Sequence, residues 1–150
     1  MRLLFNILAI LGSAMFAGVL LAIGVILGGY WASLPPADFL DWFSQNGQFI
    51  MRAIPLVLIP PLIGLAGMLW LSWGERKVRM LWLGSIACIA TVLILTVTWF
   101  LPNNAQFSGK AIPLDQVSAK LHLWLQIHNL RIALAAIASV LGVIAITRKP

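Results

Sequence analysis

The sequence predicts an all-α fold, a bundle of four transmembrane helices in an up-down-up-down arrangement. Three observations lead to this fold class. First, 61% of the 150 residues are hydrophobic and only 9% are charged, whereas soluble domains carry about 25% charged residues. Second, the apolar residues form four long segments joined by short connections, which is typical of antiparallel neighbouring helices. Third, the basic residues lie at the ends of these segments, where membrane proteins place them.

The expected spans cover residues 3–30, 50–70, 80–100 and 121–146, and they make residues 1–150 a single membrane domain. The first apolar run continues well beyond a signal-peptide core of about 7–15 residues, so we interpret it as an uncleaved span. Small residues in this span predict a face that another helix can approach closely. That helix belongs either to the same chain or to a second copy in a homo-oligomer. The small residues are Ala14, Gly18, Ala22, Gly24 and Gly28.

Residues 31–49 are expected to form the first connection. Within it, Asp38 is expected to cap a short amphipathic helix that lies on the membrane surface. Asp38 and Asp41 are two of the four acidic residues in the chain. Two interpretations remain open for this pair: both are solvated charges, or one is the counter-ion of a buried arginine.

Prolines predict two irregular places in the chain. Pro60 and Pro61 lie in the middle of the second span, where each removes a backbone donor, so we expect a kink there. The kink borders either a cavity or ordinary helix packing. Pro102 is expected to end the third span and to open a connection over residues 101–114. Asp115 is then expected to cap the last helix.

The distribution of basic residues predicts the orientation. Lys110 and Lys120 lie on one side of the membrane, with Arg52 at its edge, and six basic residues lie on the other side. The positive-inside rule therefore places both termini in the cytoplasm of a multi-pass protein, and we expect a bacterial inner membrane. The six residues are Arg2, Arg76, Lys77, Arg79, Arg148 and Lys149.

Several classes of protein are excluded by composition. The net charge of +6 is spread over segment ends and does not form one basic face, so we expect membrane lipid as a partner and no nucleic acid. Cys88 is the only cysteine and Glu75 the only glutamate, which excludes a cysteine metal site and a di-iron bundle. His122 and His128 lie on one helix, which excludes a bis-histidine haem. We expect neither a metal nor a cofactor.

The last span carries the strongest candidate site. Trp124, His128 and Arg131 follow one another at i, i+4 and i+7, so at about 100° per residue they share one helix face. We expect the membrane boundary near Ile127, which places Arg131 about one turn inside. An arginine there costs about 2.5 kcal/mol or more in hydrocarbon, so it should point toward a partner or a polar cavity.

The topology brings further polar residues to the same outer depth and so predicts an outward-facing pocket. Such a pocket suits a planar, partly anionic ligand: a phenolate, a quinone or a lipid headgroup. Arg131 would stabilise the oxyanion, and His128 would accept or donate a proton. The further residues expected at this pocket are Arg52, Asn103, Asn104 and Asp38.

Each of these residues also has a purely structural interpretation. Arg52 can snorkel to lipid headgroups from the end of its span. His128 can be an ordinary residue of the membrane interface. Arg131 can tie the last span to Asn103 or to an acid of the first connection.

Three short motifs resemble the DUF1772 family, also called anthrone oxygenase-like. They are Arg52 at the start of the second span, Pro102-Asn103 after the third, and Trp124-x3-His128-x2-Arg131 at the start of the fourth. The resemblance covers nearly the whole chain in layout. In fungal polyketide pathways, members of that family are associated with cofactor-free oxidation of anthrones to anthraquinones by dioxygen, and most bacterial members have no assigned function.

The resemblance implies candidate roles. His128 would be the base, Arg131 and Asn103 would hold the oxyanion, and Trp124 would be a further site residue. Arg52, Asn104 and Asp38 remain ligand-binding candidates from the topology alone. The alternative is a non-enzymatic membrane protein whose polar cluster pins helices or binds lipid or a partner protein.

Overall fold

The computed structural model describes residues 1–148, and all regular structure in that range is helical. In chain order the elements are α1 (Arg2–Ala22), the π-helical segment η1 (Ile23–Leu27), α2 (Gly28–Ser33), α3 (Pro36–Leu71), α4 (Arg76–Leu95), the π-helical segment η2 (Thr96–Phe100), α5 (Leu101–Ser108) and α6 (Leu114–Thr147).

These elements join into four continuous helical rods. Each rod is long and apolar enough to cross a membrane, so the predicted membrane bundle is confirmed. The rods are Arg2–Ser33, Pro36–Leu71, Arg76–Ser108 and Leu114–Thr147. At about 1.5 Å per residue each is longer than the roughly 30 Å hydrocarbon core, so the rods tilt or extend beyond it.

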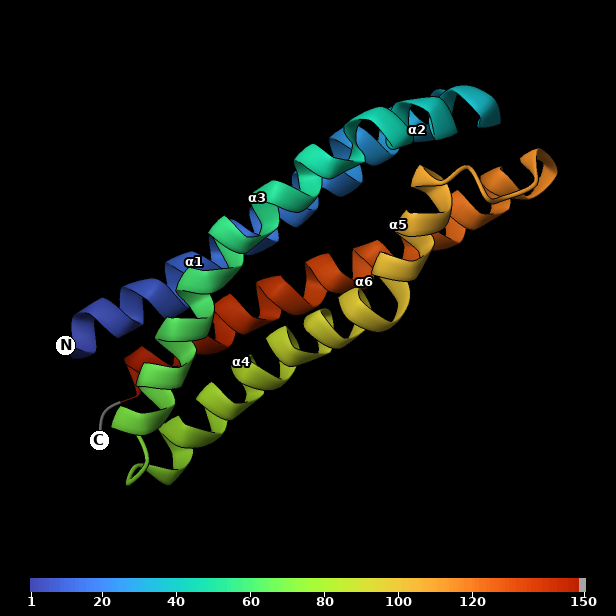
Figure 1. The fold of residues 1–150 in the computed structure, drawn as a ribbon. Coiled ribbons are helices and arrows are strands. Elements are labelled where there is room, and N and C mark those ends of the chain that lie inside the picture. Colours follow the sequence, from blue (N-terminus) through green and yellow to red (C-terminus); the bar gives the residue numbers. More distant parts are fainter. Residues whose placement is uncertain (149–150) are drawn as a thin grey trace.

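The four rods form an elongated bundle (Figure 1) in which one pair of neighbouring rods is in little contact. α1 packs along α3 and α6, and α6 packs along α4, whereas the sequence neighbours α3 and α4 touch only sparsely. The start of α1 and the end of α6 lie at the same end of the bundle (Figure 1). Residues 72–75, which join α3 to α4, also lie there, and we call this the terminal end. Of the basic residues predicted on this side, Lys149 lies outside the described residues.

Glycines let the backbones of α1 and α3 touch. A Cβ atom on Gly64 would lie 2.1 Å from the backbone nitrogen of Ala9, and one on Gly12 would lie 2.8 Å from Pro61. No side chain fits at such distances. The contact between these two rods is therefore built on the absence of side chains, as in other close helix pairs.

The small residues of the first span divide into two groups. Gly24 and Gly28 face α6, where a Cβ atom would lie 2.9 Å from His128 and 2.5 Å from Leu125. Gly18 would meet nothing within 4 Å. Its neighbours at a spacing of four, Ala14 and Ala22, are exposed. Part of the predicted face thus serves packing within the chain, and the rest is free.

The first predicted connection is wrong in extent. Residues 31–49 are not a loop, because α2 ends at Ser33 and α3 begins at Pro36. Proline is favourable at the first helical position, where its missing N–H is not needed. Asp38 lies in the first turn of α3, where its charge suits the helix dipole, but its side chain caps nothing.

The helix α3 passes through three internal prolines, Pro55, Pro60 and Pro61, without ending. It bends in its green second half, in agreement with the kink expected for the second span (Figure 1). In hydrocarbon no water replaces a broken backbone bond, so the helix bends and keeps its remaining bonds.

The third predicted connection is also too long. α5 continues the rod beyond Pro102 as far as Ser108, and only residues 109–113 connect it to α6. The π-helical segment η2 precedes Pro102 and replaces the regular bonding pattern with i to i+5 bonds. Pro102 therefore lies near the start of a new helical segment, where proline is tolerated. Asp115 lies in the first turn of α6 and makes no side-chain cap.

Candidate functional site

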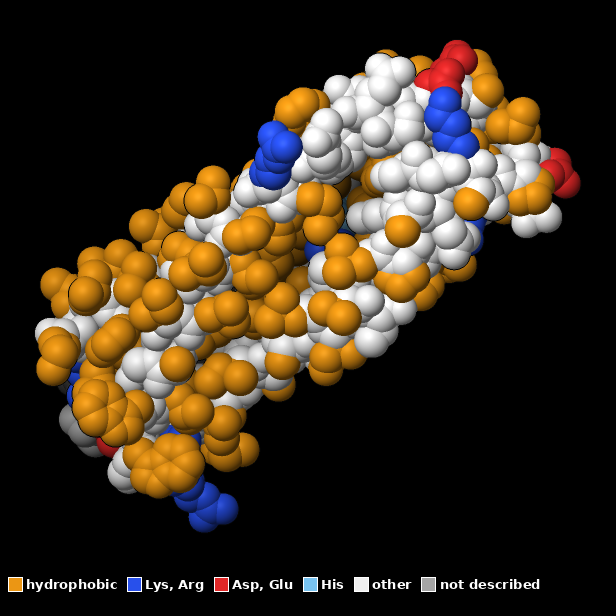
Figure 2. All heavy atoms as spheres, in the orientation of Figure 1, with side chains coloured by type: hydrophobic (Ala, Val, Ile, Leu, Met, Phe, Trp, Pro, Cys, Tyr) orange, Lys and Arg blue, Asp and Glu red, His pale blue; other side chains and the backbone are white. Residues whose placement is uncertain are grey.

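A cavity of about 510 Å³ lies between the rods in the half of the bundle away from the terminal end. Its size falls within the roughly 300–1,000 Å³ typical of small-molecule sites. α3 forms one wall, η2 and α5 form the opposite wall, and α1, η1 and α6 form the floor. Figure 2 shows a hollow between α3 and the α4–α5 rod, with Lys or Arg atoms at its base.

The predicted face of the last span lines this cavity. Trp124, His128 and Arg131 are buried in α6, with 4%, 1% and 5% of their surface exposed. The indole of Trp124 stacks on the imidazole of His128, with ring centres 4.8 Å apart and planes 12° from parallel. Helical spacing thus places these three side chains together, as expected.

The hydrogen bonds of His128 define its tautomer. Its Nε2 lies 2.8 Å from the backbone carbonyl oxygen of Leu20 in α1. A carbonyl only accepts, so Nε2 carries the hydrogen and donates it. The other ring nitrogen, Nδ1, lies 3.4 Å from Nη1 of Arg131 and accepts from it. His128 is therefore a neutral ring whose lone pair faces the guanidinium.

Both π-helical segments border the cavity. η1 starts three residues after Leu20, and its Ile23 lines the floor; η2 contributes Thr96 and Phe100 to the opposite wall. π-Helical turns occur frequently at functional sites because they redirect side chains and carbonyl groups. Here one follows the carbonyl that binds His128, and the other brings Phe100 against Arg131.

Arg131 is buried without an acidic partner. Its guanidinium carbon lies 4.1 Å from the centre of the Phe100 ring, which is a cation–π contact. Its Nε has no hydrogen-bond partner. Within residues 1–148 the ion pairs join Arg2 to Glu75 and Lys110 to Asp41, and neither involves Arg131. The cavity therefore contains a cation whose hydrogen-bonding capacity is largely unused.

The two adjacent asparagines have different positions. Asn104 lines the cavity, and its Oδ1 accepts a hydrogen bond of 2.9 Å from the indole Nε1 of Trp124. Asn103 is buried outside the cavity lining and donates from Nδ2 to the carbonyl oxygen of Trp99 at 2.7 Å. Of this pair, the structure brings Asn104 to the predicted site and leaves Asn103 as a local helix contact.

Two further predicted site residues also lie outside the cavity. Arg52 is exposed on α3, where it donates to Oε1 of Gln48 at 3.4 Å and lies over the ring of Phe49. Asp38 is exposed in the first turn of α3. The counter-ion interpretation of the two aspartates fails for the described residues, because Asp41 pairs with Lys110 and Asp38 takes part in neither ion pair.

Sequence reasoning missed Trp31 and Phe100 as site residues. Both line the cavity and are 1% exposed, and the indole Nε1 of Trp31 has no hydrogen-bond partner. A tryptophan at the end of a span is normally an interface anchor, so its position gave no signal. Phe100 reaches the cavity through the register of η2, which no spacing rule predicts.

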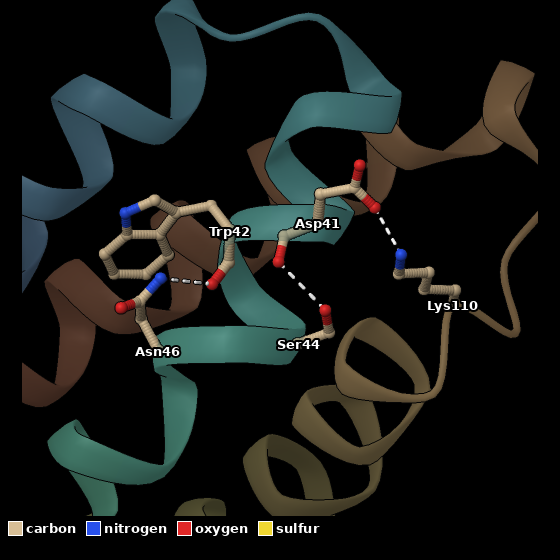
Figure 3. A network of polar contacts seen from close by, with 5 residues as sticks. All are labelled: Asp41, Trp42, Ser44, Asn46 and Lys110. Carbon is tan, nitrogen blue, oxygen red and sulfur yellow. Dashed lines mark hydrogen bonds and ion pairs between the residues drawn. The ribbon is translucent and has the colours of Figure 1, made fainter.

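Aromatic side chains join α3 to α5 in the half of the bundle away from the terminal end. Phe107 of α5 packs edge-on against Phe39 and Phe43 of α3, with ring centres 5.0 Å and 5.5 Å apart; we call these three residues the aromatic cap. Beside it, Lys110 reaches from the connection after α5 to the carboxylate of Asp41 (Figure 3). Figure 3 also shows Ser44 donating to the backbone carbonyl of Asp41.

Fold and site together define a four-helix integral membrane protein with an internal, aromatic-lined cavity that holds a single arginine. No protein-family model, curated protein or solved structure matches the chain. Within the described residues no group of three His, Cys, Asp or Glu side chains could hold a metal ion.

Proposed function

We propose that this protein binds a planar, lipophilic ligand with an acidic oxygen, such as a phenol, an enol or a quinone-like molecule, in the cavity. The observation that carries the proposal is the buried guanidinium of Arg131, which has no acid to pair with. A buried cation without a partner is costly, and an oxyanion from a ligand would offset that cost.

The walls suit a planar ring. Trp31, Phe43, Phe100 and Trp124 line the cavity with aromatic surface, against which a flat ligand packs favourably. Asn104 uses its Oδ1 for Trp124, which leaves its amide Nδ2 to donate to a second ligand oxygen. Apolar walls with a few convergent donors are the usual composition of such sites.

The resemblance to anthrone oxygenase-like proteins adds a reaction to this binding proposal. Arg131 would leave Nδ1 of His128 and bind the carbonyl oxygen of an anthrone, which frees the Nδ1 lone pair to accept the ring-carbon proton. The resulting anion is delocalised onto the oxygen beside Arg131. It reacts with one dioxygen molecule, and the anthrone becomes an anthraquinone with release of one water molecule.

A structural role for the same cluster is the second candidate function. The hydrogen bond from His128 to Leu20 ties α6 to α1, and the contact of Arg131 with Phe100 ties α6 to η2. In that case the polar cluster pins helices, and the cavity has no dedicated ligand.

The proposed location is a bacterial inner membrane, with both termini in the cytoplasm. Support comes from the basic residues: Arg2, Arg76, Lys77 and Arg79 belong to the terminal end of the bundle, and the positive-inside rule assigns that end to the cytoplasm. The cavity then lies in the outer half of the membrane.

The first experiment measures oxygen uptake by the purified protein with 1,8-dihydroxyanthrone, against the spontaneous rate. Wild-type protein is compared with His128→Ala and Arg131→Gln, and Arg52→Gln is the matched control, since Arg52 lies outside the cavity. We expect uptake above background in wild type and Arg52→Gln, and loss by a factor of about 100 or more in the two cavity variants.

Each outcome separates the candidates. Uptake that survives in His128→Ala would overturn the role of the base. No uptake by wild type, combined with saturable binding of the anthrone that Arg131→Gln abolishes, would leave a binding protein. No binding, combined with a lower thermal midpoint in Arg131→Gln, would favour the structural role.

A further inference from the structure

The cavity has its opening on the long side of the bundle and not at one of its two ends. Toward the end away from the termini, the aromatic cap and the Asp41–Lys110 pair hold α3 to the α5 region. Toward the terminal end, residues 72–75 join α3 to α4. α3 and α4 touch only sparsely, and Figure 2 shows the hollow on this side of the molecule.

Two apolar residues mark the edges of this opening. Met51 on α3 and Leu101 on α5 both line the cavity, yet 41% and 37% of their surface is exposed. A residue that lies both on the outer surface and on the cavity wall lies at an opening of the cavity. We call the gap between Met51 and Leu101 the lateral window.

The window opens at the outer edge of the hydrocarbon, because Met51 and Leu101 each lie within one residue of the expected end of a span. On α6, Arg131 follows the expected boundary residue Ile127 by four positions, which is about 6 Å of helix rise into the hydrocarbon. Of the lining residues of α3 near the window, Ile50, Met51 and Ile54 are apolar, and Gln48, one turn toward the outer end, is polar and exposed. From the bilayer side, Arg131 at the floor is thus reached past the apolar part of this rim.

We infer that the ligand is a membrane-dissolved amphiphile that enters the cavity sideways through the lateral window. Its planar phenol or enol head lies beside Arg131, and its hydrocarbon chain passes between Met51 and Leu101 into the lipid. This inference rests on the proposed function, because it names the ligand class for the same cavity.

The depth of Arg131 favours a weak acid over a permanently charged lipid. A phosphate headgroup would have to leave the water interface as an ion, which is costly in hydrocarbon. A phenol travels through the bilayer as the neutral molecule and ionises only at the site. There its O–H bond breaks, its proton moves to Nδ1 of His128, and the phenolate oxygen pairs with Arg131.

The test uses 4-dodecyl-2-nitrophenol, whose visible absorbance reports the phenolate, added to the protein in phosphatidylcholine nanodiscs. We expect a stoichiometric phenolate band that Arg131→Gln abolishes. Met51→Trp should slow both appearance and chase-out of the band by about tenfold, because a large ring narrows the window without removing the site. Ala53→Trp, on the same helix but outside the cavity lining, is the matched control and should leave both rates unchanged.

The outcomes distinguish this inference from the proposed function. A phenolate band that forms and decays at wild-type rates in both Met51→Trp and a second variant, Leu101→Trp, would overturn lateral access but keep the binding site. If no band forms with the dodecyl probe or with 4-methyl-2-nitrophenol, the proposed function fails as well. Stoichiometric displacement of the probe by added phosphatidylglycerol would show that a permanently anionic lipid occupies the site, against the weak-acid class.

Discussion

At the scale of single residues, Arg131 is the side chain whose position is costly for folding. It is 5% exposed, it has no acidic partner among the described residues, and its Nε is unpaired. The cation–π contact with Phe100 stabilises the buried Arg131 by about 2 kcal/mol or less. A buried charge without a partner lowers stability, so Arg131 should destabilise the ligand-free bundle.

Replacing Arg131 with methionine should therefore stabilise the ligand-free protein. Methionine fills the same space without a charge, and removal of an unpaired buried charge should contribute about 1 kcal/mol or more to the free energy of unfolding. For a chain of this length the thermal midpoint in detergent should rise by about 2–4 °C per kcal/mol. A lower midpoint would mean that Arg131 pins the helices, as in the structural alternative.

At the scale of helices, the bundle depends on where side chains are missing. Gly64 sits against the backbone of Ala9, so α1 and α3 pack with their backbones in contact. Gly18, on the same helix as Ala9, faces open space. Two glycines with the same intrinsic flexibility thus have opposite structural roles.

Alanine substitutions at these two glycines should act in opposite directions. Gly64→Ala forces α1 and α3 apart and should cost about 1–3 kcal/mol as an overpacked contact. Gly18→Ala meets no neighbour and should add up to about 1 kcal/mol, since alanine is the better helix former. Thermal unfolding of both variants in the same detergent measures the difference. Equal midpoints would contradict the close approach of the two rods.

Helix-scale features also set the limit of what the sequence could predict. Apolar runs predicted four spans, and helical spacing predicted that Trp124, His128 and Arg131 share a face, because both follow from local periodicity. The first and third predicted connections were too long, because a helix begins again at Pro36 and the third rod continues past Pro102, and proline is tolerated at the start of a helical segment. Asn103 was predicted from its expected depth and from the resemblance, but it lies outside the cavity lining. Phe100 was missed because the π-helical register of η2 depends on packing and leaves no pattern in the sequence.

At the scale of the whole molecule, four antiparallel rods place the start of α1 and the end of α6 on one side. The connection at residues 109–113 lies at the other end of the bundle. These two ends carry different numbers of basic residues, and the proposed orientation in the membrane rests on this difference.

Cysteine labelling in intact cells would check this orientation. In a Cys88→Ala background, Ala111→Cys lies in the exposed connection after α5, and Gly74→Cys lies in the connection after α3. A membrane-impermeant maleimide should label Ala111→Cys in intact cells and Gly74→Cys only after lysis. The reverse labelling pattern would contradict the proposed orientation and would place the cavity in the inner half of the membrane.

The sparse contact between α3 and α4 has a consequence for the surroundings of the protein. Under the proposed lateral access, three sides of the cavity are protein and the fourth side is made of acyl chains. Chain length, unsaturation and lateral pressure would then become part of the binding site, although no residue changes. The same purified chain would hold the proposed ligand with one affinity in detergent and with another in each membrane that it occupies.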